Sequence, residues 1–143
     1  MSSKIIKILV FVCVAACFAA WRVGAGTVVE LVRVIDGDTF VFNLDGLPVG
    51  RKVLSGEFTV RLAGVDTPEM RGRCESETAR ALAAKRFASG MLNAATVIEV
   101  ARPRIGKSGI VAEVRIDGLS LASLIIKSGH GRTYTGGRRK GWC

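Results

Sequence analysis

The chain has 143 residues and is 49% hydrophobic, which gives room for one domain with an apolar core. Twenty-one Lys and Arg residues outnumber twelve Asp and Glu residues, and this balance favours polyanionic partners, although it also fits simple solubility or adhesion to an anionic membrane. A single histidine excludes a zinc or acid–base site built on several histidines.

The first 25 residues have the pattern of an export signal. Two lysines precede an uncharged run over residues 8–20, and small residues follow at 23–25, where a signal peptidase could cut. The run is shorter than the roughly 20 residues of a membrane span. We therefore expect residues 1–25 to be a signal peptide and the protein to be periplasmic or secreted. Residues 14–17, Val-Ala-Ala-Cys, also resemble a lipobox, which would leave the protein lipid-anchored at Cys17.

Without the leader the net charge is about +6, and two cysteines remain, Cys74 and Cys143. In an oxidising compartment this count predicts one disulfide, and the alternative is two free thiols. A bond closing so long a loop could stabilise the fold by roughly 4 kcal/mol.

Three strands are predicted in the first half of the mature chain. Residues 27–34 are rich in β-branched side chains, residues 36–38 supply a turn, and residues 39–42 follow as a second strand. Residues 45–52 have turn chemistry and are predicted to be an extended hairpin tip or a loop. Residues 57–65 alternate apolar and polar side chains, so we expect a third strand with Arg61 on the face opposite Leu62.

The second half alternates helices and strands. Residues 76–92 predict an amphipathic helix. Its apolar face would hold Ala79, Leu82, Ala83, Phe87 and Met91. Strands are expected over residues 96–100 and 110–116, and a second helix over 119–127 before Gly129. Five strands with a helix after the third predict a mainly β, α+β fold. The architecture we expect is a five-stranded Greek-key barrel of the OB type with two to three helices, over residues 27–143.

Two short stretches, residues 35–39 and 60–69, contain the residue types that a metal-assisted attack on a phosphodiester requires. Hard cations bind carboxylate and carbonyl oxygens, and water near such an ion becomes a better nucleophile. A glutamate can take a proton from that water, and an arginine can offset the charge that grows on the phosphate. Each stretch alone would be interpreted as an ordinary turn or loop.

Together, Ile35-Asp36-Gly37-Asp38-Thr39 and Val60-Arg61-Leu62-Ala63-Gly64-Val65-Asp66-Thr67-Pro68-Glu69 resemble the motifs of the staphylococcal nuclease (thermonuclease) family. The resemblance covers roughly residues 28–143 and continues at residues 74–77, 114–118, 134–137 and 142–143, which look like an exported bacterial branch. It implies a nuclease domain on an OB barrel that uses Ca2+ and acts on DNA and RNA.

The resemblance also implies a role for individual residues. Asp38 and Asp66 would ligate the ion, and Thr67 would add its backbone carbonyl. Glu69 would be the general base or would position the water, and Arg61 would bind the scissile phosphate.

The family has a second phosphate-binding arginine, and at this point the chain departs from the pattern. The corresponding stretch, residues 106–111, is one residue shorter and has Gly109 or Ile110 where the arginine should be. Arg102, Arg104 and Lys107 are nearby basic residues, of which we take Arg104 and Lys107 as candidate substrate-binding residues.

Two further features concern the substrate. The resemblance places Tyr134 near a bound nucleotide, where it could stack on a base, and the alternative is that it packs the tail. Basic residues over 132–140 could follow the backbone of a polyanion or form a solvated surface.

Three functions are consistent with these observations. The first is a calcium-dependent, sequence-tolerant phosphodiesterase, slowed by the missing arginine, since one such donor is worth about 100- to 1000-fold of a much larger acceleration. The second is an impaired OB module that binds nucleic acid or another polyanion. The third is a lipid-anchored structural protein of the envelope. No protein partner is implied, we expect a monomer, and the membrane would be contacted only through an uncleaved or lipidated leader.

Overall fold

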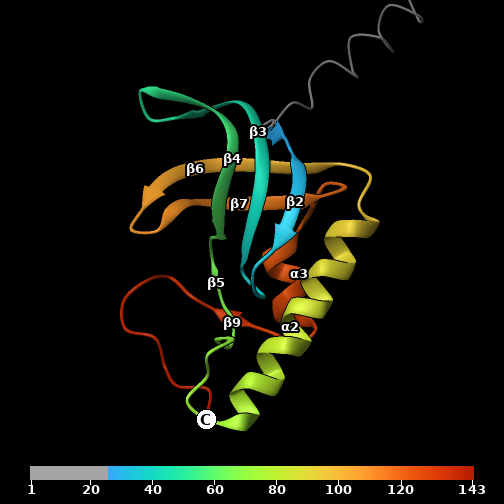
Figure 1. Cartoon of the computed structure of the whole chain (residues 1–143), viewed down its shortest axis with the longest axis vertical. Helices are drawn as coiled ribbons and strands as arrows, with labels where there is room; N and C mark the ends of the chain where they lie inside the picture. The colour runs from blue at the N-terminus through green and yellow to red at the C-terminus, as the bar shows by residue number, and fades with distance from the viewer. Residues whose placement is uncertain (1–25) are drawn as a thin grey trace, which may run out of the picture.

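A computed structural model describes residues 26–143, so the expected leader and Cys17 lie outside the described residues. The described chain forms a mainly β, α+β fold with a strongly curled sheet and two helices (Figure 1). Neither of these helices combines the length and the apolar character needed to cross a bilayer.

Nine strands and two helices make up this part of the chain. The strands are β1 (Thr27–Val28), β2 (Glu30–Val34), β3 (Thr39–Val49), β4 (Lys52–Leu62), β5 (Val65–Asp66), β6 (Ile98–Gly106), β7 (Gly109–Ile116), β8 (Leu119–Ser120) and β9 (Arg132–Thr133). The helices are α2 (Glu75–Ala94) and α3 (Leu121–Lys127). The expected alternation of long strands and helices is confirmed. The count of five strands is wrong, because the chain adds short pairings at β1, β5, β8 and β9.

The main sheet has the order β1-β6-β7-β4-β3-β2, and β8 pairs with the last two residues of β7, Arg115 and Ile116. Neighbours are antiparallel except β4 and β7, which pair in parallel over three residues of each strand. Figure 1 shows β6 and β7 crossing behind β2, β3 and β4, so the sheet curls around its apolar face. That face forms the core, which includes Phe40, Phe42, Val60, Val100 and Val114.

The β3–β4 hairpin is longer than expected. Both strands continue through residues 45–52, and Gly50, with φ of +62°, and Arg51 form a tight turn at the end. Of the two expectations for this stretch, the extended hairpin tip is confirmed and the loop is wrong. In β4, Val60 and Leu62 are buried while Arg61 lies on the opposite face, as the alternation predicts.

Helix α2 forms where it is expected, but it buries a different face. The buried residues are Glu77, Ala81, Ala84, Ala88 and Leu92, whereas Ala79 and Leu82 of the predicted face are exposed. Small alanine side chains let the helix approach the sheet closely. Larger apolar residues such as Phe87 and Met91 pack at the edge of this contact, where they are half-buried.

A second, two-stranded sheet lies below the main one. It pairs β5 with β9 in antiparallel register, with Asp66 opposite Arg132. The chain then loops back so that its last residue lies beside the start of α2 (Figure 1). This return brings residues 132–143 to the Asp66 loop.

Candidate functional site

Asp38 is positioned by the turn between β2 and β3. The backbone N–H of Ile35 donates to the carbonyl of Thr39 at 2.9 Å, and Asp36 Oδ1 accepts the N–H of Asp38 at 3.1 Å. The Asp38 carboxylate is 1% exposed. Its Oδ2 accepts Arg61 Nη2 at 2.8 Å and the N–H of Thr67 at 3.3 Å. Asp38 therefore lies against both Arg61 and the peptide that follows Asp66.

Burial of Asp38 has an electrostatic consequence. Removal from water raises the pKa of this carboxyl from 3.8 to about 6, although the nearby Arg61 guanidinium acts in the opposite direction. The negative charge of Asp36 adds to the increase. The carboxyl is thus held in a site where a further positive charge would be favourable at neutral pH.

Asp66 is the second buried carboxylate, also 1% exposed. Its Oδ2 accepts two hydrogen bonds from Arg132, from Nη2 at 2.8 Å and Nε at 3.0 Å, and one from Trp142 Nε1 at 3.2 Å. Its Oδ1 is buried without a hydrogen-bond partner among the described residues, and Arg139 Nε lies 3.3 Å away. A buried carboxylate oxygen with an unused acceptor position is a natural ligand for a hard cation.

Glu69 lies at the rim of the site, with its side chain 51% exposed. Arg139 Nη1 pairs with Glu69 Oε1, so this guanidinium contacts Glu69 and Asp66 together. Burial lowers the pKa of Arg139, but the carboxylates of Asp66, Asp38 and Glu69 outweigh that effect and raise it above its ordinary value. Arg139 is therefore permanently charged between the two carboxylates.

The loop that carries Asp66, Thr67 and Glu69 is anchored by Glu77 of α2. The Glu77 side chain is buried, and its carboxylate accepts the backbone N–H of Arg73 at 2.8 Å and that of Glu69 at 3.5 Å. Glu77 is the third residue of the helix, where a carboxylate can satisfy N–H groups that precede the first turn. No role is assigned to this residue from the sequence, so its anchoring of the loop is a finding of the structure.

Three cavities surround these residues. One of about 220 Å³ is lined by Asp66, Glu69, Arg139 and Trp142, among others. A larger one of about 820 Å³ is lined by Arg61, Arg104, Lys107, Tyr134 and Arg139. The third, of about 270 Å³, lies over the β6–β7 turn and again includes Arg61 and Arg139. Arg139 lines all three and so lies between the acidic and the basic parts of the site.

The structure thus brings the predicted site residues to one region. Asp38, Arg61 and Thr67 are in direct contact, and Asp66 and Glu69 are joined through Arg139. The other three line the large cavity: Arg104, Lys107 and Tyr134. Arg104 and Lys107 are exposed and form no ion pair within residues 26–143.

The β6–β7 turn explains why the second arginine is absent at its expected position. A Cβ at Gly109 would lie 2.6 Å from the backbone carbonyl oxygen of Thr59, and the residue has φ of +132°. Ile110 is 2% exposed and belongs to the core. A side chain at Gly109 would have to displace the Thr59 carbonyl of β4, and an arginine at Ile110 would place its charge in the core.

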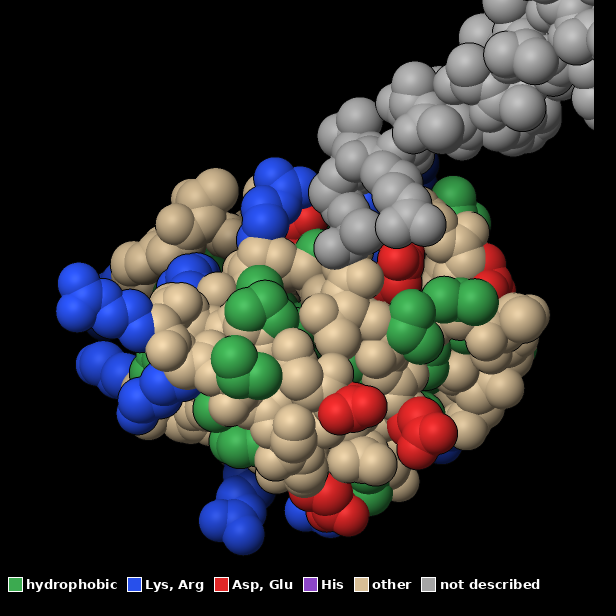
Figure 2. Space-filling model, turned by 90° about the horizontal axis from the view of Figure 1, so that it is seen from above, with side chains coloured by type: hydrophobic (Ala, Val, Ile, Leu, Met, Phe, Trp, Pro, Cys, Tyr) green, Lys and Arg blue, Asp and Glu red, His purple; other side chains and the backbone are tan. Residues whose placement is uncertain are grey.

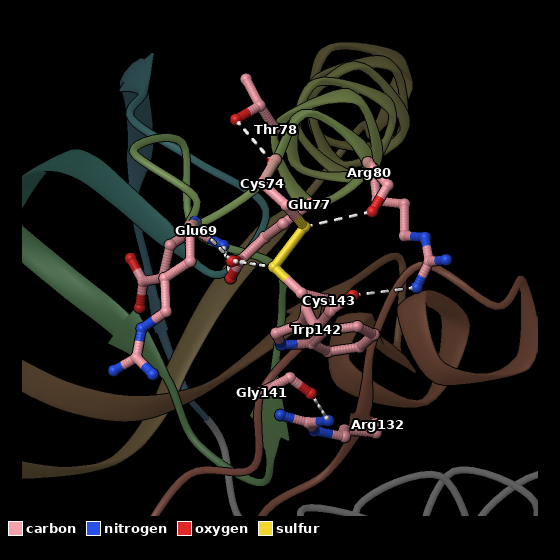
Figure 3. Close-up of a disulfide and its surroundings, with 11 residues drawn as sticks. Glu69, Cys74, Glu77, Thr78, Arg80, Arg132, Gly141, Trp142 and Cys143 are labelled. Carbon is pink, nitrogen blue, oxygen red and sulfur yellow. Dashed lines mark hydrogen bonds between the residues drawn. A yellow bond between two sulfur atoms is a disulfide. The ribbon is translucent and has the colours of Figure 1, made fainter.

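The C-terminal segment reaches the site because it is tied to α2. Cys74 and Cys143 lie at disulfide-bonding distance, with Cα atoms 6.0 Å apart (Figure 3). Figure 3 shows Trp142 next to this bond, with the Arg132 guanidinium beneath its ring, 4.1 Å from the ring centroid. Arg132 also donates to the backbone carbonyls of Lys140 and Gly141. The segment is therefore held at both ends.

Sequence reasoning missed three of the residues in this site, Arg132, Arg139 and Trp142. The basic residues over 132–140 were predicted only as a surface that could follow a polyanion. A usable signal was present, because a bond between Cys74 and Cys143 necessarily returns the tail to the segment that follows Glu69.

One edge of the molecular surface is basic. Figure 2 shows Lys and Arg side chains gathered at one edge, on the side where Figure 1 places the β3–β4 and β6–β7 turns. Acidic side chains lie elsewhere on the face shown.

Comparison with protein-family models and with curated protein sequences finds no match to this chain.

Proposed function

We propose that the chain is an exported, calcium-dependent phosphodiesterase that cleaves DNA and RNA with little sequence preference, on an OB-type barrel of the thermonuclease kind. The observation that carries this proposal is the meeting of two buried aspartates, an exposed glutamate and two arginines, each about one-third exposed, beside a basic cavity. The curled sheet and the two helices are compatible with such a barrel.

The residues fit a hard divalent cation. The donor set is all oxygen, and the buried Asp66 Oδ1 accepts no hydrogen bond from the described residues, with Arg139 Nε lying 3.3 Å from it. Asp38, Asp66 and the carbonyl of Thr67 would hold the ion. Calcium at this site would supply Lewis acidity and partial neutralisation of the phosphate charge.

The chain's own residues account for the remaining steps. Glu69 is exposed enough to accept a proton from a water molecule while the oxygen of that water attacks phosphorus. Arg61 hydrogen-bonds the non-bridging oxygens, whose negative charge increases in the transition state. One P–O ester bond breaks, and the leaving oxygen takes up a proton, so that phosphodiester and water give a phosphomonoester and an alcohol.

A second candidate is a module that binds nucleic acid without useful turnover. Its specific support is the ion pairing of Asp66, because Arg132 and Arg139 already supply positive charge at this carboxylate. A metal ion would have to compete with both.

Single-stranded DNA incubated with the purified protein tests the proposal. We expect cleavage in calcium and none in chelator. A Glu69→Gln variant, purified in parallel, should lose the activity, and it also controls for contaminating nucleases. DNA that stays intact in calcium but is retarded in a mobility-shift assay would support the binding module instead.

A further inference from the structure

We infer that Arg139 supplies a second phosphate-binding guanidinium, delivered to the site from the C-terminal segment rather than from the β6–β7 turn. The inference rests on the proposed function and extends it to a residue that motif comparison does not assign. It follows from the position of Arg139, its partners and the way its segment is held.

Arg139 and Arg61 face the same space. Both side chains are about one-third exposed, at 32% and 33%, and both line the cavities of about 820 and 270 Å³. A phosphodiester has two non-bridging oxygens, and guanidinium groups match such oxygens with parallel N–H donors. Two arginines on the walls of one basic cavity can therefore contact one phosphate.

Arg139 is not needed to balance Asp66. Arg132 already gives the Asp66 carboxylate two hydrogen bonds, and Trp142 gives a third. The Asp66 Oδ1 contact of Arg139 is an ion pair at 3.3 Å without a hydrogen bond. The guanidinium can thus turn from this contact, and from its pair with Glu69 Oε1 at the rim, toward a bound phosphate while Asp66 keeps its other partners. This turn would also free Glu69 to accept a proton.

The segment that carries Arg139 is fixed on both sides. On one side, β9 pairs with β5 and Arg132 stacks on Trp142. On the other side, the Cys74–Cys143 pair attaches the end of the segment to α2. Arg139 also lies over the Tyr134 ring, 5.6 Å from its centroid. These contacts restrict the positions that Arg139 can take, as a phosphate ligand requires.

The test compares Arg139→Ala and Arg139→Lys with Arg138→Ala. Arg138 is the neighbouring residue, is exposed and has no hydrogen bond or ion pair among residues 26–143, so it controls for the loss of one positive charge in the same segment.

Cleavage of single-stranded DNA in calcium is the first readout. We expect kcat to fall by about 100-fold or more in Arg139→Ala, with a partial loss in Arg139→Lys, which keeps the charge but not the fork of donors. Arg138→Ala should keep the wild-type kcat.

The second readout does not depend on cleavage. Fluorescence anisotropy of a labelled single-stranded oligonucleotide, in chelator and over a range of salt, measures Kd and its salt dependence. One lost phosphate contact should lower the slope of log Kd against log salt by about 0.7 for Arg139→Ala. Arg138→Ala should change the slope less, because Arg138 lines none of the three cavities. Thermal unfolding verifies that each variant is folded. If Arg139→Ala does not fold, the kcat and salt slope of Arg139→Lys decide whether Arg139 contacts phosphate.

The outcomes separate this inference from the proposed function. If the wild-type protein cleaves DNA and Arg139→Ala is equally active, only the role of Arg139 is overturned, and the proposed function stands. A wild-type protein that never cleaves would remove the proposed activity, while a binding loss specific to Arg139 variants would still establish the phosphate contact. Equal Kd and equal salt slopes for Arg139→Ala and Arg138→Ala would overturn the inference whether or not the protein cleaves.

Discussion

Burial of the Asp38 carboxyl has a clear energetic cost, because it disfavours the charged form of this group. Its pKa rises from 3.8 to about 6 because it is buried, so the folded protein binds this proton more tightly than the unfolded chain does. The resulting stability is fully present below pH 3.8 and is lost as pH rises through about 6. Since one pKa unit corresponds to about 1.4 kcal/mol, the difference is on the order of 3 kcal/mol.

Asp38→Asn should therefore stabilise the protein in chelator at pH 8, where the wild-type carboxylate is charged and buried. We expect a higher Tm for the variant under these conditions and a smaller difference near pH 4. Calcium should raise the Tm of the wild type at pH 8 but not that of Asp38→Asn, because the variant lacks a ligand. Differential scanning calorimetry with and without calcium measures both effects. A variant that is less stable than the wild type at pH 8 in chelator would contradict this account of Asp38.

At this scale the sequence predicted most of the residues that meet in the candidate site. Asp38, Arg61, Asp66 and Glu69 occur in two compact motifs, so their proximity follows from strand pairing over a short stretch of chain. Arg139 could not be found in this way. It is separated from Glu69 by 70 residues, and only the tertiary return of the tail joins them.

At the scale of elements, the packing of the β2–β3 turn on α2 determines where Asp38 lies. A Cβ at Gly37 would be 2.8 Å from Ala84 Cβ and 3.0 Å from Thr67 Oγ1. The turn, the helix and the Asp66 loop therefore meet at one glycine. A side chain at this position would have to push them apart.

Gly37→Ala should destabilise the protein by about 1 to 3 kcal/mol, the usual cost of overpacking. It should also lower activity, since it moves Asp38 relative to Thr67. The helical Gly90 has open space around its Cβ position, and Gly90→Ala is the control, expected to stabilise α2 by about 0.5 to 1 kcal/mol. Urea unfolding gives these free energies.

A double-mutant cycle checks the cause of the Gly37 effect. Ala84→Gly removes the atom that the new Cβ would meet, so Gly37→Ala should cost less in the Ala84→Gly background than in the wild type. If the cost is the same in both backgrounds, contact with α2 is not the source of the destabilisation.

The face of α2 shows why packing is harder to predict than helix formation. Apolar periodicity predicted the helix, but it favoured the face that includes Leu82, Phe87 and Met91. The buried face is a stripe of alanines with Glu77, because close approach to the turn at Gly37 requires small side chains and the loop requires an anchor. Neither requirement is visible in the helix sequence alone.

On the scale of the whole molecule, the Cys74–Cys143 pair joins the end of the described chain to the first turn of α2. It closes a loop of 69 residues, and such a bond stabilises a fold by about 4 kcal/mol in the chain-entropy view. Reduction should lower the free energy of unfolding by about this amount or less. Urea unfolding with and without reductant measures it, and a Cys74→Ser/Cys143→Ser double variant should match the reduced wild type.

Activity should respond to reduction as well, because the bond holds the segment that carries Arg139. We expect the reduced protein and the double serine variant to lose kcat at temperatures where both remain folded. Unchanged kcat in the folded, reduced protein would mean that β9 alone positions the segment.

The overall architecture could be predicted further than its details. The order of long strands and helices follows from periodicity and turn residues. The short strands β5, β8 and β9 could not be predicted, because two-residue pairings such as Asp66 with Arg132 have no periodic signal. Their partners are fixed by the curl of the sheet and by the return of the chain.

The pairing of β5 with β9 also determines when, during synthesis and folding, the residues of the candidate site are all present. A ribosome that has completed residues 1–100 has released Asp38, Arg61, Asp66 and Glu69, but Arg132, Arg139 and Trp142 have not yet been made. Contacts over such sequence separations cannot form before the later residues are made, and their loop-closure entropy slows folding. Under the proposed function, a nascent chain without residues 132–143 would lack Arg139 and be less active toward the transcript that encodes it, and its full reactivity would arise only after this segment had folded back onto the Asp66 loop.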